Sequence, residues 1–153
     1  MPNATVNLDL EFLKLDNQLC FPLYAASRLI IQAYAPALET LKLTYPQYLV
    51  MLVLWENETL SVKELGNKLF LDSGTLTPLL QKLESNQLIM RTRSPRDDRT
   101  VLNTLTPKGR SLQAVALQAI NDVFCNSGLM TQESADLKEM LSRFIQKVAV
   151  LNA

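Results

Sequence analysis

The sequence predicts a mainly α-helical fold with one small β-hairpin, and composition and residue spacing both support this. Only 4 of the 153 residues are Gly, and clusters of Gly and Pro, which mark turns, are sparse. Hydrophobic residues make up 48% and charged residues 20%, as in globular proteins. Apolar residues recur at helical spacing along most of the chain, except at 88–105. This length suits one domain, 1–153.

Two helices are predicted first. The earlier one is long and mostly apolar, over about 16–41, with Pro22 and Pro36 as candidate kinks. The later one opens at Thr44-Tyr45-Pro46-Gln47, where Thr and a Gln three residues on form a capping box with Pro in the first turn. The apolar run that follows predicts a buried helix through Trp55.

Two shorter helices follow. Ser61-Val62-Lys63-Glu64 is a second capping box, and it opens a helix that reaches about Phe70. The next helix covers about 72–86, although Pro78 disturbs its first turn.

A β-hairpin is predicted next. Two short runs rich in β-branched and long side chains, 88–93 and 100–105, flank the polar turn 94–98. Thr106 then caps a long amphipathic helix whose first residue is Pro107.

The order of these elements predicts a winged helix-turn-helix over about 44–110. After the hairpin, Asn126-Ser127-Gly128 ends one amphipathic helix and Thr131 caps the last one. Such long helices, over about 10–42 and 111–153, cannot bury their apolar faces on so small a lobe. They need each other or a second copy of the chain, so we expect dimerisation helices and a homodimer.

The chain has no histidine and only two cysteines, which excludes most catalytic and metal-binding chemistry. No cofactor and no metal are expected. The N-terminus lacks the pattern of a signal peptide, and the longest apolar run, Tyr48–Trp55, is far shorter than the roughly 20 residues of a membrane span. We therefore expect a soluble cytoplasmic protein without membrane contact. In a reducing cytosol, Cys20 and Cys125 are then inert buried thiols or redox-active ones.

Net charge hides a split that points to double-stranded DNA. The 15 basic and 15 acidic residues cancel over the whole chain. From Lys63 to Arg110, however, nine basic and five acidic residues give 9 − 5 = +4, which leaves −4 for the remainder. Four of these cations are arginines at 91–99, on the hairpin, where a duplex minor groove would attract them. A solvated hairpin of mixed charge is the alternative.

The helix that precedes the hairpin begins with small polar residues, Ser73-Gly74-Thr75-Leu76-Thr77. Such side chains can reach base edges, and backbone N–H groups at a helix N-terminus can hold a phosphate. An ordinary helix cap is the alternative for Ser73. Asp97 is expected to orient a hairpin arginine. The other predicted DNA contacts are Ser73, Thr75, Thr77, Gln81, Lys82, Arg93, Arg96 and Arg99.

Several motifs resemble the MarR family of dimeric winged-helix regulators. Asp97-Asp98-Arg99 followed by Leu105-Thr106-Pro107-Lys108-Gly109 is similar to the wing signature of that family. The resemblance is greater to its organic hydroperoxide resistance branch (OhrR), and it weakens after about residue 112. That branch is matched by Leu15-Asp16-Asn17-Gln18-Leu19-Cys20-Phe21, by Leu43-Thr44-Tyr45-Pro46-Gln47-Tyr48-Leu49 and by Leu71-Asp72-Ser73-Gly74-Thr75-Leu76-Thr77-Pro78-Leu79-Leu80.

The resemblance implies a repressor that releases its operator DNA when an organic hydroperoxide oxidises Cys20. Tyr34 and Tyr45 would hydrogen-bond the thiolate, with Tyr24 close by. Cys125 would be the resolving cysteine of the two-Cys type and would form a disulfide with Cys20. The target gene is then expected to encode a thiol peroxidase. The sequence departs from the pattern at Pro22, two residues after Cys20. Pro22 removes a backbone N–H and would either kink the helix or start it there.

The chemistry of the residues constrains this reading. A free thiol has a pKa of about 8.5, and without histidine only tyrosine hydroxyls and a helix N-terminus can lower it. Tyr34 lies 14 residues after Cys20, which is about 21 Å along one straight helix. A tyrosine contact with Cys20 would therefore come from the partner chain in a two-fold dimer. An apolar surround of Phe21, Leu23, Tyr24 and Tyr45 would favour alkyl over inorganic peroxide.

Other interpretations remain open. Cys20 and Cys125 could be core residues, and Tyr45 could pack as a staple at the helix entry. A regulator released by a small phenolic ligand is one alternative function. A thiol peroxidase is another, although no Arg or Thr flanks Cys20, and we expect no enzymatic activity. A protein-interaction module built on the long helices is the third.

Overall fold

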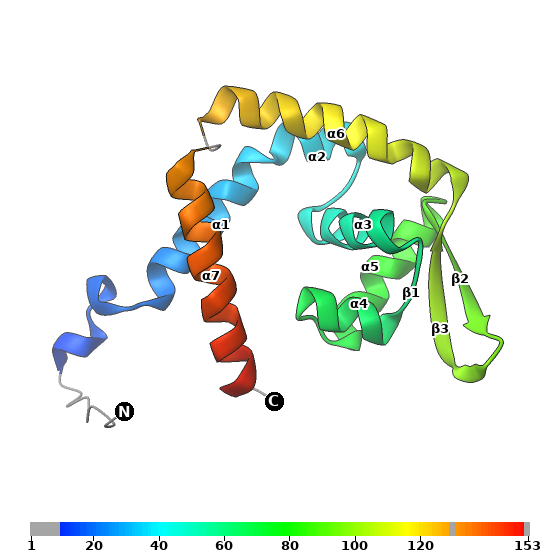
Figure 1. The fold of residues 1–153 in the computed structure, drawn as a ribbon, viewed down its shortest axis with the longest axis horizontal. Coiled ribbons are helices and arrows are strands. Elements are labelled where there is room, and N and C mark those ends of the chain that lie inside the picture. Colours follow the sequence, from blue (N-terminus) through cyan, green and yellow to red (C-terminus); the bar gives the residue numbers. More distant parts are fainter. Residues whose placement is uncertain (1–9, 129–130, 152–153) are drawn as a thin grey trace.

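The computed structural model describes residues 10–128 and 131–151, and it confirms a mainly helical chain with a small antiparallel sheet (Figure 1). A winged helix-turn-helix lobe lies at one end, and long helices extend from it. In chain order the elements are η1 (Leu10–Leu13), η2 (Leu15–Asn17), α1 (Cys20–Ala33), α2 (Ala35–Leu41), α3 (Tyr45–Asn57), β1 (Thr59–Ser61), α4 (Val62–Leu69), α5 (Ser73–Ser85), β2 (Ile89–Ser94), β3 (Asp97–Leu105), α6 (Pro107–Ser127) and α7 (Gln132–Leu151).

The predicted first helix is divided into three pieces. A 3₁₀ turn precedes α1, which begins at Cys20, and Tyr34 separates α1 from α2. Pro36 explains that separation, because it cannot donate a hydrogen bond to the preceding turn and is tolerated only near a helix start. Pro22 is the third residue of α1, where a backbone N–H would have no partner within the helix. Of the two predictions for Pro22, a kink or a helix start, the structure has the helix start.

Local capping fixes the starts of the lobe helices as predicted. The Thr44 N–H donates to Gln47 Oε1 at 2.9 Å, and the Ser61 N–H donates to Glu64 Oε2 at 2.8 Å. Thr106 Oγ1 accepts from the Gly109 N–H at 3.0 Å, which begins α6 directly after the sheet. These bonds span only three residues, so the sequence alone is enough to set them.

The sheet has three strands in the order β1-β3-β2, whereas only the hairpin β2–β3 is predicted. β1 pairs antiparallel with β3, Thr59 opposite Thr104. The hairpin tip is also tighter than predicted, because β3 already begins at Asp97. Residues 97 and 98, predicted in the turn, therefore belong to the strand.

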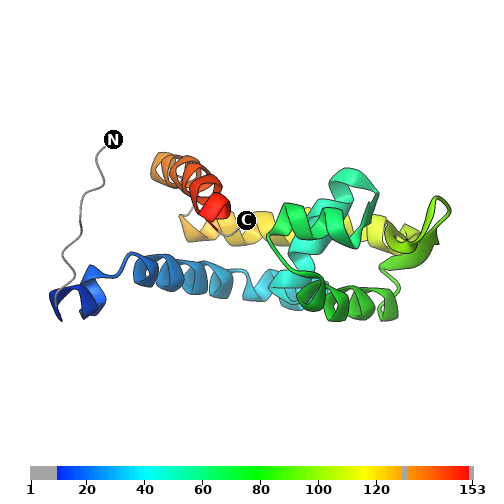
Figure 2. The same cartoon turned by 90° about the horizontal axis from the view of Figure 1, so that it is seen from below.

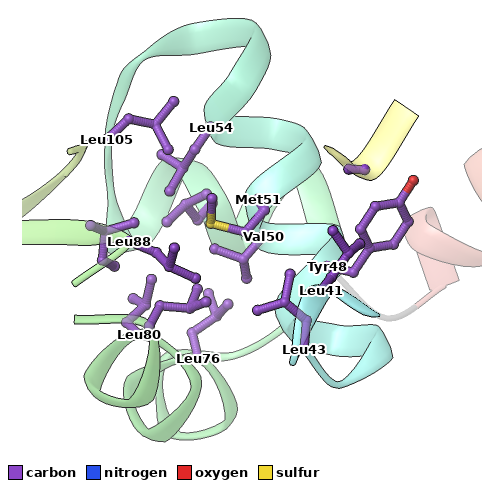
Figure 3. Packing of buried hydrophobic residues seen from close by; sticks show 14 of the residues in the cluster. Leu41, Leu43, Tyr48, Val50, Met51, Leu54, Leu76, Leu80, Leu88 and Leu105 are labelled. Carbon is purple, nitrogen blue, oxygen red and sulfur yellow. The ribbon is translucent and has the colours of Figure 1, made fainter. Parts of the chain in front are cut away.

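The buried core belongs to the lobe. In Figure 3, Val50, Met51 and Leu54 of α3 face Leu76 and Leu80 of α5. All five are fully buried. Helix α2 joins this core through Leu38 and Leu41, although it falls within the predicted dimerisation segment 10–42. The Trp55 indole N–H donates to the Gly109 carbonyl at 2.8 Å, which fixes the start of α6 on α3.

The long helices leave apolar surface uncovered. In Figures 1 and 2, α1 and α7 lie outside the lobe, and neither has a buried residue. Their exposed apolar side chains include Phe21, Leu29, Ile30, Leu137, Met140, Phe144, Ile145, Val150 and Leu151. Surface of this kind is typical of an oligomer interface. A dimer formed by 10–42 and 111–153 remains a prediction.

Candidate functional site

Cys20 is the first residue of α1, and its side chain is exposed in the single chain. The N-terminus of a helix carries a partial positive charge. Among the described residues, no side chain donates a hydrogen bond to its sulfur. Within one chain, Cys20 is therefore not a core residue.

Tyr24 lies one turn after Cys20 on α1 and is 59% exposed. The Arg28 guanidinium donates to the Tyr24 hydroxyl at 3.3 Å, and its carbon lies 5.6 Å from the centre of the ring. Tyr24 is thus the one predicted thiolate-supporting tyrosine that the fold brings near Cys20 in the same chain.

The other two predicted tyrosines belong to an aromatic cluster, which consists of Tyr34, Tyr45, Tyr48, Trp55 and Phe124. The Tyr34 ring centre lies 5.3 Å from Tyr45, 6.0 Å from Tyr48 and 5.5 Å from Phe124. Tyr48 in turn lies 6.3 Å from Trp55. The apolar residues expected around Cys20 are therefore not all together in one chain. Tyr45 packs in this cluster, whereas Phe21 and Leu23 lie on the first turn of α1.

Burial controls the chemistry of these phenols. It raises the pKa of Tyr34 to about 12, with further contributions from the neighbouring Tyr45 and Tyr48. Burial also raises the pKa of Tyr45 and of Tyr48. All three hydroxyls consequently stay protonated near neutral pH, which is the form that donates a hydrogen bond to a thiolate.

The free energy of unfolding should fall as the pH rises above 10, the ordinary tyrosine value. Because the folded chain holds the Tyr34 proton more tightly, this stabilisation is complete below pH 10.0 and is lost as the pH passes about 12. Tyrosinate absorbance during an alkaline titration and urea unfolding at several pH values measure the two effects. Tyr34→Phe should remove the ionisation near pH 12, and an unchanged titration curve would contradict the assignment.

Cys125 lies beside this cluster. It directly follows Phe124 near the end of α6, is exposed, and has a weak hydrogen bond to Asn121 Oδ1 at 3.7 Å. Cys20 lies at the opposite end of α1 from Tyr34, about 21 Å away along the helix axis. In Figure 1, α1 runs away from the C-terminal end of α6. Within one chain, Cys125 therefore follows the Phe124 that packs on Tyr34, whereas Cys20 lies one turn from Tyr24.

The N-terminus of α5 is predicted to hold a phosphate, but the structure has an acidic side chain there. Asp72 is the N-cap, and its carboxylate accepts from the Thr75 N–H at 2.9 Å and from Thr75 Oγ1 at 2.8 Å. These two bonds lower the pKa of Asp72. The helix end is thus covered by a carboxylate, which would repel a phosphate there.

The wing comprises β2 and β3. Some of the DNA contacts predicted on α5 and on the wing line the same cavity. A cavity of about 1470 Å³ is lined by Ser73 and Thr77 of α5, by Arg99 of the wing and by apolar residues of α7. Gln81 and Lys82 are exposed further along α5. Thr100 lines the same cavity and is missing from the predicted set, although its position next to Arg99 could have suggested it.

Asp97 does not orient an arginine side chain. Its carboxylate accepts from the Arg99 backbone N–H at 3.0 Å and from Thr100 Oγ1 at 2.9 Å, and these bonds lower its pKa. Asp97 therefore shapes the start of β3. Arg93 donates weakly to the Asp98 carbonyl at 3.4 Å, whereas Arg96 and Arg99 are exposed and pair with no described acidic side chain.

Two cations of the basic segment serve the fold. Arg91 is mostly buried, and its backbone N–H and guanidinium both contact Glu84. Arg110 forms a two-pronged ion pair with Glu58, with Nε 2.9 Å from Oε1. The positive charge available to a partner is therefore smaller than the count of basic residues in the sequence suggests.

In the described part of the chain, no group of three Cys, Asp or Glu residues could hold a metal ion. Nor does a described helix have the length and apolarity to cross a membrane.

Comparison with known proteins gives consistent matches. Residues 32–114 match the family model "Transcriptional regulator SarA/Rot". The organic hydroperoxide resistance transcriptional regulator of Bacillus subtilis is 48% identical over 132 residues, which cover 86% of this chain and 88% of the relative. Reduced AbfR bound to DNA has a TM-score of 0.79 at 34% identity, over 93% of this chain and 99% of that one. Disulfide-formed AbfR has a TM-score of 0.65 at 35% identity, over 91% and 94%.

Proposed function

Because the chain belongs to the MarR family of transcriptional regulators, in its organic hydroperoxide resistance branch, we propose that it is a dimeric two-Cys repressor. In this proposal the reduced homodimer binds double-stranded operator DNA. An organic hydroperoxide oxidises Cys20, Cys125 of the partner chain resolves the product, and the DNA is released.

The separation of the two cysteines carries this proposal. A disulfide requires Cα atoms about 4.4–6.8 Å apart. Within one chain, Cys20 and the Tyr34 end of α1 are about 21 Å apart, and Cys125 lies at the Tyr34 end. An antiparallel pairing of α1 with its copy would bring Cys20 of one chain to Tyr34, Tyr45 and Cys125 of the other.

The chemistry needs no group beyond these residues and the peroxide. The Cys20 thiolate attacks the distal oxygen of ROOH, the O–O bond breaks, and Cys20 becomes a sulfenic acid. The leaving alkoxide RO⁻ takes a proton from water and departs as the alcohol ROH. The Cys125 thiolate then attacks the Cys20 sulfur, which forms the S–S bond and releases water after proton transfer. The phenols of Tyr34 and Tyr45, which stay protonated, would stabilise the Cys20 thiolate beforehand.

Shape supports the link from disulfide to DNA. The reduced chain has a higher TM-score to reduced AbfR on DNA, 0.79, than to disulfide-formed AbfR, 0.65, at nearly equal sequence identity. Two recognition helices must lie about 34–36 Å apart to enter successive major grooves. A disulfide between the dimerisation helices would tilt the lobes and change that spacing.

A gel shift with reduced, cumene-hydroperoxide-treated and re-reduced protein, run beside a non-reducing gel, tests the proposal. We expect binding, loss of binding and recovery, with a disulfide-linked dimer in the second state alone. Binding that ignores oxidation would contradict it. Release by a small phenol without oxidation would favour the ligand-controlled alternative, and repeated peroxide turnover would favour a thiol peroxidase.

Arg96→Ala and Arg99→Ala should each weaken binding to many DNA sequences about equally. Both guanidiniums are exposed, and a lost phosphate contact lowers the slope of log affinity against log salt by about 1. Binding titrations at several salt concentrations measure this slope. Arg91→Lys is the matched control, because Arg91 is held by Glu84 within the lobe. An unchanged slope in both alanine variants would exclude wing insertion.

A further inference from the structure

Two threonine hydroxyls near the N-terminus of α5 can only accept hydrogen bonds from a partner, because their protons are already donated within the chain. Thr75 Oγ1 donates to Asp72 Oδ2 at 2.8 Å, and Thr77 Oγ1 donates to the Ser73 carbonyl at 2.7 Å. A hydroxyl carries one proton, so each of these oxygens keeps only its lone pairs for another molecule. Toward a bound partner, Thr75 and Thr77 are acceptors.

Pro78 adds a third acceptor. It lies inside α5, and it has no N–H to donate to the carbonyl of Gly74, four residues earlier. Gly74 and Pro78 are both exposed, on the face of α5 opposite the buried Leu76 and Leu80. Because Gly74 has no side chain, nothing at its own position shields its carbonyl oxygen. Pro is strongly disfavoured within a helix, so its presence there requires an explanation.

We propose that the N-terminal half of α5 reads exocyclic amino groups of DNA bases, with the carbonyl of Gly74, freed by Pro78, as the central contact. This inference rests on the proposed DNA-binding function. In the major groove, the only base donors are the N6 amino group of adenine and the N4 amino group of cytosine. Adenine fits better, because the exposed Pro78 ring can also pack on the methyl group of the paired thymine.

The test uses the reduced full-length protein and duplexes enriched by it from a random library. In an enriched duplex, single adenines are replaced by purine, which lacks the N6 amino group, and single cytosines by 2-pyrimidinone, which lacks N4. At constant salt, we expect one replacement in each half-site to cost the protein about three- to tenfold in affinity. Whether that base is adenine or cytosine identifies the amino group.

Pro78→Ala supplies the decisive comparison. It restores the backbone N–H that pairs with the Gly74 carbonyl, so the variant should be more stable to heat and yet lose the discrimination to within about twofold. Pro107→Ala is the matched control, since Pro107 is the first residue of α6 and has no helical carbonyl four residues earlier. It should discriminate as the unmodified chain does.

Equal discrimination by Pro78→Ala and the unmodified chain would overturn the role of Gly74. Insensitivity of the unmodified chain to every amino-group deletion would overturn the whole inference. Failure of the unmodified chain to enrich any sequence would instead count against DNA binding itself, and so against the proposed function.

Discussion

Cys20→Ser should bind operator DNA as well as the unmodified chain and lose its response to organic hydroperoxides. The Cys20 side chain is exposed at the first residue of α1, so replacing sulfur by oxygen removes the nucleophile and leaves the core unchanged. Oxidation should lower the operator affinity of the unmodified chain by about 100-fold, within the usual range of coupling between two sites. The affinity of Cys20→Ser should change by less than about twofold. Fluorescence anisotropy with a labelled operator duplex measures both.

Tyr24→Phe is an informative companion to this variant. It removes the hydroxyl that Arg28 contacts and retains the ring, so it tests whether Tyr24 supports the thiolate. Slower oxidation with unchanged DNA binding is the expected pattern. Release of DNA by peroxide in Cys20→Ser would show that another group senses the oxidant.

Elements fixed by local interactions could be predicted from the sequence. The helix starts at Thr44, Ser61, Thr106 and Thr131 follow from capping bonds within three residues of each. Strand β1 could not, because three residues have too little pattern and their partners in β3 lie more than 40 positions later. Its existence depends on the tertiary pairing alone.

The candidate site shows the same division. Cys20, Tyr24 and the predicted wing contacts could be named from motif and charge, and all of these side chains are exposed. The wing contacts are Arg93, Arg96 and Arg99. The contact of Tyr34 with Phe124 joins segments 90 residues apart, and it has no local signal. The predicted partner of Asp97 is wrong, because a carboxylate beside an arginine suggests an ion pair, whereas turn geometry favours the backbone N–H.

A heterodimer of one Cys20→Ser chain and one Cys125→Ser chain should form a single disulfide between its chains when treated with hydroperoxide. Neither chain then contains both cysteines, so a disulfide within a chain is impossible. In the proposed dimer, Cys20 of the Cys125→Ser chain still meets Cys125 of the other chain. Two affinity tags of different mass allow the mixed dimer to be isolated and its cross-link to be seen on a non-reducing gel. The two variant homodimers, each treated in the same way, control for pairing of like cysteines.

The mixed dimer also separates the redox step from DNA release. If each disulfide contributes the same free energy to tilting the lobes, one bond supplies half of it, and affinity should fall by about tenfold against about 100-fold for two. A mixed dimer without a cross-link would mean that the disulfide forms within a chain. Cys125 lies near Tyr34, and about 21 Å of helix separates Tyr34 from Cys20. A disulfide within one chain would therefore require α1 to unfold or break first. A cross-linked dimer with undiminished affinity would instead mean that the disulfide does not control the lobes.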